Sequence, residues 1–181
     1  MSDKPKLTRR KFVQMAAVAS AAGPMVACLG PGNPWRSLAA AEARTLEAMC
    51  ERIIPADQDP GAAWAGVVNY IDRQLTGHYR KLRRAYRLGL AGVESSSVAM
   101  FGKSFVALNA GQQDKLLQAM DSGQVQGEGW KQLSAKSFFD LVVSHTTQGF
   151  YGDPRHGGNR DRVSWKMIRL PYPPLRGRLT S

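Results

Sequence analysis

The sequence predicts a mainly α-helical domain of four to five helices, followed by a long ordered loop rich in Gly, Pro and aromatic residues and by an extended tail. Three observations favour this fold class: apolar residues recur at spacings of three and four, capping residues precede two of the apolar stripes, and no convincing strand pattern occurs. The chain has 181 residues, 43% hydrophobic and 22% charged. It is therefore long enough to bury a core within a single domain.

The first helix is expected to begin near Ser37 and to end at Pro55. Its apolar positions form a single stripe: Leu46, Met49, Cys50, Ile53 and Ile54. Cys50 on this stripe predicts a small buried side chain, with a disulfide to Cys28 as the less favoured alternative. Residues 55–61, PADQDPG, predict a turn, because they lack the spacing and the closing Glu of a calcium-binding EF-hand loop.

The second helix is expected to start within residues 62–66 and to reach about Leu90, with Gly77 able to divide it. Its outer half, residues 78–87, holds five Lys or Arg side chains. This basic run favours a solvated helix face or a contact with a protein partner over a phosphate-binding patch. No helix-turn-helix pattern or repeated aromatic platform accompanies it, so nucleic acid is not predicted as a partner.

Residues 94–108 predict a loop with a short helical or extended piece. Asn109 and Gln112 then form a capping box for a short helix that buries Leu116, Leu117 and Met120. Ser134 is expected to cap a further helix. The inner side of that helix carries Phe138, Leu141, Val142 and His145.

The last third, from Gln148 onward, is dense in Gly, Pro, aromatic and Arg residues and predicts an ordered irregular loop or a partner-binding arm. Phe150, Tyr151 and Trp165 offer rigid contact area of the kind found at protein interfaces. In the alternative interpretation, these aromatic side chains close over the helical core.

No catalytic, cofactor-binding or metal site is predicted. None of the three histidines, His78, His145 and His156, pairs with another at a spacing of three or four, and the two cysteines do not form a metal-binding pattern. His145 is interpreted as a hydrogen-bonded core residue. A general-base pair of His156 with Asp153 or Asp161 is the least favoured alternative, and the glycine-rich and nucleophile-elbow motifs of nucleotide-binding proteins and hydrolases are missing.

The first 27 residues have the order of an export signal: a basic stretch, an apolar run over residues 12–22, and then small residues. Arg9, Arg10 and Phe12 resemble the twin-arginine motif, with a simple amphipathic helix as the alternative. Residues 25–28, MVAC, resemble a lipobox that would lipidate Cys28, and cleavage near Ala27 or within residues 39–41 is the alternative. The expected division is a signal at 1–27, a linker at 28–36 and the helical domain with its arm at 37–181.

Four stretches together resemble the gluconate 2-dehydrogenase subunit 3 (small, or gamma, subunit) family of membrane-bound sugar and sugar-acid dehydrogenases. They are the leader motif at 8–13, the blocks 43–57 and 66–75, and the C-terminal segments 149–154, 157–161 and 165–168. The C-terminal segments are the most specific of these. They add Asp153, Asn159, Arg160 and Lys166 to the aromatic residues expected to contact a partner. Residues 169–174, RLPYPP, depart from the Gly-Tyr-Pro-Gly that is usual in the family.

The resemblance implies a non-catalytic subunit of a heterotrimer. Its partners would be a large FAD-binding subunit of the glucose–methanol–choline type and a multihaem cytochrome c, so that FAD and haem c lie in the partner subunits. This chain would support folding of the large subunit and its export through the twin-arginine translocase, to the periplasmic face of the inner membrane. The alternatives are a stand-alone periplasmic scaffold or binding lipoprotein and, less favoured, a small hydrolase.

Overall fold

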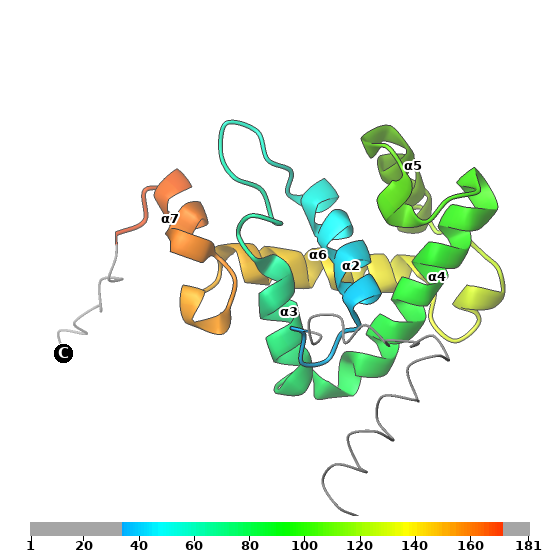
Figure 1. The fold of residues 1–181 in the computed structure, drawn as a ribbon, viewed down its shortest axis with the longest axis horizontal. Coiled ribbons are helices and arrows are strands. Elements are labelled where there is room, and N and C mark those ends of the chain that lie inside the picture. Colours follow the sequence, from blue (N-terminus) through cyan, green and yellow to red (C-terminus); the bar gives the residue numbers. More distant parts are fainter. Residues whose placement is uncertain (1–33, 172–181) are drawn as a thin grey trace, which may run out of the picture. The chain divides into compact units, whose positions relative to one another are not determined.

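The structure, a computed structural model, describes residues 34–171, so the predicted signal residues Arg9, Arg10, Phe12 and Cys28 lie outside the described part. Within that range the regular secondary structure is helical and contains no strand, which confirms the predicted fold class (Figure 1). The α-helices are α2 (Ala40–Ile53), α3 (Val67–Thr76), α4 (Arg83–Phe101), α5 (Ala110–Asp121), α6 (Ala135–Tyr151) and α7 (Val163–Met167). None of the helices in the described range is long and apolar enough to cross a membrane.

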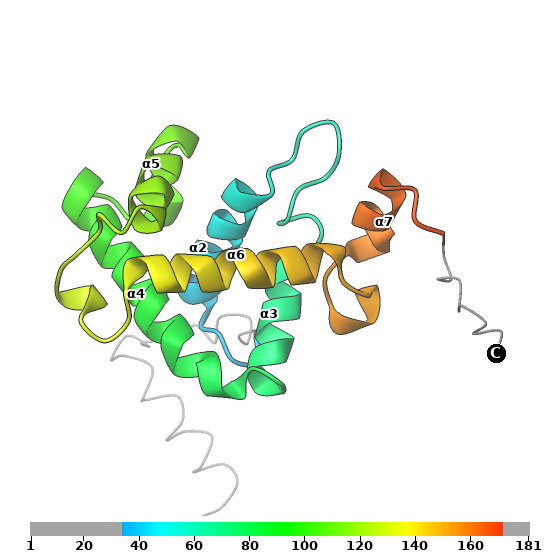
Figure 2. The ribbon, with the colours of Figure 1, turned by 180° about the vertical axis from the view of Figure 1, so that it is seen from behind.

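Helix α6 is the central element of the domain. It runs across α2, α3 and α4, and it also contacts α5 (Figure 2). The largest side chains of the core come from all of these helices and from the short 3₁₀ turn η3 (Phe105–Ala107). Tyr86, Phe105, Phe138 and Phe150 are each fully buried. One continuous apolar core therefore holds the helices together, and α6 lies at its centre.

Local signals place several helix ends where the sequence predicts them. The Asn109 side chain accepts from the Gln112 backbone N–H at 2.9 Å, and Gln112 returns a bond to the Asn109 N–H, which completes the predicted capping box of α5. Ser134 caps α6 by accepting from the Ser137 N–H at 3.1 Å. The second predicted helix is divided after Gly77 into α3 and α4, with the 3₁₀ turn η2 (Arg80–Leu82) between them.

The prediction of a loop at residues 94–108 is wrong for the first half of this range, because α4 continues to Phe101. Tertiary contacts hold this part of the helix. Ser96 accepts a hydrogen bond from the Trp130 indole at 2.9 Å, and the buried Ser97 hydroxyl donates to the Lys103 carbonyl at 2.7 Å. The loop expected from Gln148 onward also begins too early, since α6 extends to Tyr151 and the short helix α7 follows.

The buried carboxylate of Asp72 fixes the point at which the linker meets the domain. It accepts backbone N–H bonds from Arg36, Ser37 and Leu38 at 2.8, 2.8 and 3.0 Å. Three donors on one carboxylate offset the cost of burying its charge. The segment that precedes α2 is thereby held against α3.

Cys50 and His145 are both buried, as the sequence predicts. The Thr146 hydroxyl donates to the Cys50 sulfur at 3.2 Å, and burial raises the pKa of this free thiol to about 12. His145 Nδ1 shares a hydrogen bond with the Tyr86 hydroxyl at 2.8 Å, and its ring stacks on Tyr79 with centroids 4.3 Å apart. Burial lowers the pKa of His145, because a low-dielectric surrounding disfavours the imidazolium.

Candidate partner-binding surface

The C-terminal part of the described chain folds back as a compact clasp, which we define as residues 152–170. It contains the 3₁₀ turns η5 (Pro154–His156) and η6 (Arg160–Arg162) and helix α7. The clasp lies beyond the C-terminal end of α6 and beside the start of α3 (Figure 1). Five of the seven residues predicted to contact a partner belong to it, and the other two, the buried Phe150 and Tyr151, end α6.

The fully buried side chain of Asn159 organises the interior of the clasp. Its amide Nδ2 donates to the Gly152 carbonyl at 2.9 Å, and its Oδ1 accepts from the Ser164 backbone N–H at 3.1 Å. The residue has φ 47°, in the left-handed region that Asn tolerates better than most other residues. Asn159 thus joins the end of α6 to the start of α7.

Two glycines allow the clasp and α3 to approach α6 closely. A Cβ at Gly149 would contact the Tyr70 ring at 2.9 Å, and a Cβ at Gly158 would overlap the Gly149 carbonyl oxygen. A larger residue at either position would push these backbones apart. The close approach explains why glycine stands at both positions.

The aromatic residues of this region divide into buried and exposed groups. Phe150 is fully buried, and Trp165 is 8% exposed and donates its indole N–H to the Tyr151 carbonyl at 2.8 Å. Tyr151 is 44% exposed and packs edge-to-face against Phe150 with ring centroids 5.0 Å apart. The buried side chains of Phe150 and Trp165 therefore fill the interior of this region, whereas the side chain of Tyr151 lies at its solvent-exposed surface.

A second contact fixes the clasp to the loop before α3. The Arg160 backbone N–H donates to the Ala65 carbonyl at 3.0 Å, and the Arg160 guanidinium lies over the Trp64 ring, 5.7 Å from its centroid. Trp64 is 43% exposed. A cation over an exposed indole is a modest attraction, and it holds both side chains at the surface.

The clasp carries an unusual concentration of left-handed backbone conformations. Asn159, Asp161, Arg162 and Arg169 all have positive φ, between 47° and 60°. Such conformations cost free energy for residues other than glycine, and they cluster where surrounding contacts enforce a functional shape. Here the hydrogen bonds of Asn159 and Arg160 supply the enforcing contacts.

The strained segment holds a set of exposed apolar side chains at the end of the domain. Three apolar side chains lie within four consecutive residues of this segment. They are Met167, Ile168 and Leu170, which are 38%, 58% and 43% exposed. Lys166 and Arg169, both exposed, lie between and beside them. We define the clasp surface as Tyr151, Lys166, Met167, Ile168, Arg169 and Leu170. Apolar side chains bordered by cations match the composition of protein interfaces, in which an apolar centre has a polar rim.

The structure places the seven predicted contact residues in different roles. Tyr151, Arg160 and Lys166 are exposed, whereas Phe150, Asn159 and Trp165 are buried and can act on a partner only by shaping the clasp. Asp153 is partly buried and accepts from the Arg155 N–H and Nε, both at 3.0 Å, and the hydrogen bond from the Arg155 side chain lowers the pKa of its carboxyl. Sequence reasoning missed Trp64, Met167, Ile168 and Leu170. For Met167, Ile168 and Leu170 the available signals were the apolar content of residues 167–170 within a basic segment and the family-like segment 165–168; no such signal marks Trp64 in the sequence.

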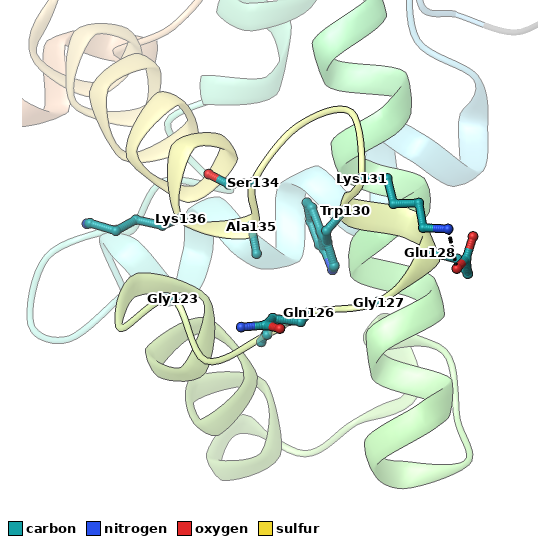
Figure 3. Close-up of a pocket in the computed structure, with 10 residues that line it drawn as sticks. Gly123, Gln126, Gly127, Glu128, Trp130, Lys131, Ser134, Ala135 and Lys136 are labelled. Atoms are coloured by element: carbon teal, nitrogen blue, oxygen red, sulfur yellow. Dashed lines mark ion pairs between the residues drawn. The ribbon is translucent and has the colours of Figure 1, made fainter.

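A separate pocket in the described residues lies beneath the loop between α5 and α6. It has a volume of about 470 Å³ and is lined by residues that include Gln126, Glu128, Trp130 and Lys131 (Figure 3). Glu128 and Lys131 form an exposed ion pair at 2.6 Å, and the Trp130 indole N–H is directed to Ser96. No His or Cys lines it, and no cluster of potential metal ligands occurs in the described part of the chain. We derive no reaction from this pocket.

Comparison with known proteins identifies one family. A family model described as gluconate 2-dehydrogenase subunit 3 matches residues 40–171, which is well over half of the chain and includes the whole clasp. Neither the curated proteins nor the solved structures give a match.

Proposed function

The chain belongs to the gluconate 2-dehydrogenase subunit 3 family, and we propose that it serves as the non-catalytic small subunit of a heterotrimeric dehydrogenase. In this proposal the chain binds a large FAD-containing subunit of the glucose–methanol–choline type and supports its folding, its export by the twin-arginine translocase and its assembly. A multihaem cytochrome c subunit completes the complex. The assembled enzyme works at the periplasmic face of the inner membrane, and its FAD and haem c belong to the partner subunits.

The observation that carries this proposal is the clasp surface. A stand-alone domain gains nothing from holding Met167, Ile168 and Leu170 in water on a backbone with several left-handed residues. A partner subunit that covers these side chains would remove their apolar area from water and so stabilise the complex. The rigid clasp would also lose little conformational entropy on binding.

The sequence of the leader supports the export part of the proposal. The twin-arginine pathway exports proteins that fold before they cross the membrane, and such proteins often carry a cofactor. This chain combines the signal residues Arg9, Arg10 and Phe12 with no recognisable cofactor motif. A signal of this type on such a chain is useful to a partner that travels with it.

Co-purification tests the proposal. A tagged chain is expressed in its native host and purified from the membrane fraction under gentle extraction, and the product is examined by mass spectrometry and visible spectroscopy. We expect a flavoprotein with flavin absorption, together with haem bands. A colourless protein that purifies alone would contradict the proposal and favour the stand-alone scaffold.

Two matched double variants test the contact surface itself. Met167→Asp with Ile168→Asp places charges on the clasp surface, whereas Val98→Asp with Val106→Asp places them on exposed apolar residues of α4 and η3. We expect the first variant to lose the flavoprotein and the second to retain it, with both giving helical circular dichroism spectra. Equal yields of flavoprotein from both variants would show that the clasp surface is not the contact.

A further inference from the structure

A strongly basic corner lies where α3 meets α4, separate from the clasp. It consists of Arg80, Lys81, Arg83, Arg84 and Arg87, in η2 and the first turns of α4 (Figure 1). The sequence contains no Asp or Glu between residues 73 and 93. Five cations thus lie within eight residues without a neutralising acid nearby in the sequence.

All five side chains are exposed, and none forms an ion pair with an acidic residue of the described chain. Their hydrogen bonds go to neutral groups. Arg83 Nε donates to the Leu75 carbonyl at 2.6 Å, and Arg84 donates to the Gln132 side chain at 2.6 Å. Arg87 lines a pocket together with Glu42 and Glu94 but forms no ion pair with either, so the positive charge of the corner remains available to an anionic ligand.

The position of these cations is unfavourable for the isolated domain. The first turn of α4 contains no acidic residue, and it carries Arg83 and Arg84 at the end of the helix where the macrodipole favours negative charge. Mutual repulsion among five neighbouring cations adds to this cost. An anionic surface bound at the corner would relieve both effects.

The chemistry of the corner favours a lipid surface over a protein. Protein contacts depend on apolar or aromatic anchors at their centre, but no exposed large apolar side chain lies between residues 73 and 93. The one nearby candidate, Tyr79, is turned inward, where it stacks on His145 and donates to Gln148 at 2.6 Å. Clustered Lys and Arg without apolar anchors are the pattern that binds anionic lipid headgroups, and guanidinium groups match phosphate oxygens geometrically.

We propose that the basic corner binds the phosphate groups of anionic phospholipids and holds this face of the domain against a membrane surface. The contact is peripheral and electrostatic, and it is independent of the proposed contact between the clasp and a flavoprotein. It would orient the domain on the membrane without inserting any helix.

Vesicle binding by the purified full chain tests this inference. The probes are vesicles of phosphatidylglycerol and phosphatidylcholine in equal parts and vesicles of phosphatidylcholine alone, at about 0.1 M salt, where charges are screened beyond about 10 Å. The leader has basic residues of its own, so Lys4, Lys6, Arg9, Arg10 and Lys11 are replaced by Gln in every protein compared. Any remaining difference then arises in the domain.

The test variant replaces Arg80, Lys81 and Arg87 by Gln, because these exposed side chains make no hydrogen bond in the domain core. The matched control replaces Arg44, Lys103 and Lys115, which are exposed elsewhere, and so removes the same charge. Each basic residue near an anionic surface strengthens binding roughly fivefold, so the test variant should lose about 100-fold in partition onto phosphatidylglycerol vesicles. The control should lose less than about fivefold.

Three results would overturn the proposal. They are equal losses in the test and control variants, binding of the unsubstituted domain to phosphatidylcholine alone as strong as to phosphatidylglycerol, or full vesicle binding by the test variant. If the test variant keeps vesicle binding but fails to co-purify the flavoprotein, the corner instead contacts an acidic face of that protein. Helical circular dichroism spectra for all variants exclude unfolding as the cause.

Discussion

Replacement of Asn159 by Ala should open the clasp. The substitution removes two hydrogen bonds, from Nδ2 to the Gly152 carbonyl and from the Ser164 N–H to Oδ1. It leaves the fully buried Ser164 N–H without a partner, which costs about 1–3 kcal/mol, and it loses about 1 kcal/mol for the second bond. Holding Ala at φ 47° adds roughly 1 kcal/mol. We expect the free energy of opening the clasp to fall by roughly 3–5 kcal/mol.

Hydrogen exchange measured by mass spectrometry on peptides of residues 160–170 reports this opening. The Arg160, Ile168 and Leu170 amides are all hydrogen-bonded in the closed clasp, so they exchange only when it opens. A loss of 3 kcal/mol corresponds to an increase of roughly 100-fold in their exchange rate, while the amides of α5 should be unaffected.

Asp161→Ala is the matched control, because Asp161 has a similar φ of 53° but is exposed and makes no side-chain hydrogen bond. It should weaken the clasp by about 1 kcal/mol or less, which isolates the contribution of backbone conformation. If Asn159→Ala accelerates exchange no more than Asp161→Ala does, the hydrogen bonds of Asn159 do not hold the clasp, and our account of the site fails.

Two further predictions concern the buried titratable residues. Because burial lowers the pKa of His145 in the folded chain, His145 binds a proton more readily in the unfolded chain than in the folded one. The free energy of unfolding should therefore fall as the pH drops below about 6.5. Urea unfolding at pH 7.5 and 5.5 should show this loss and a smaller one in His145→Phe; an equal loss in both proteins would assign it to other groups. Cys50, fully buried with its pKa raised to about 12, should not react with a thiol reagent at pH 8 until the chain is unfolded, measured in a Cys28→Ser background. Rapid labelling of the native protein would contradict the burial of Cys50 in the core.

Features that depend on a few neighbouring residues could be predicted from the sequence. The caps at Asn109 and Ser134 and the division of the second helix after Gly77 follow from local chemistry, and each is present in the structure. The burial of Cys50 and His145 follows from the period of an apolar stripe. These predictions succeed because helix formation and capping are governed by contacts within about four residues.

Features that depend on distant residues could not be predicted in this way. The last turns of α4 contain three consecutive serines, a weak helix sequence, and they are supported by Trp130, which lies more than 30 residues away. The burial of Phe150 and Trp165 likewise depends on the close approach of the clasp to α6 at Gly149 and Gly158. An aromatic residue in a glycine-rich segment gives no sign of whether it faces a partner or the core until that packing is known.

The two surfaces that we assign use different residues on either side of α3. The clasp is bound to Ala65, just before α3 begins, and to Arg73 in its last turn, whose guanidinium donates to the Arg155 carbonyl at 3.3 Å. The basic corner begins at Arg80, beyond the end of α3 at Thr76, and the hydrogen bonds of Arg83 and Arg84 go to Leu75 and Gln132 and not to the clasp. Substitutions at the corner should therefore leave the hydrogen bonds of the clasp intact. Vesicle binding and flavoprotein binding can then be lost independently, and a protein bound at the clasp leaves the corner free to face a membrane.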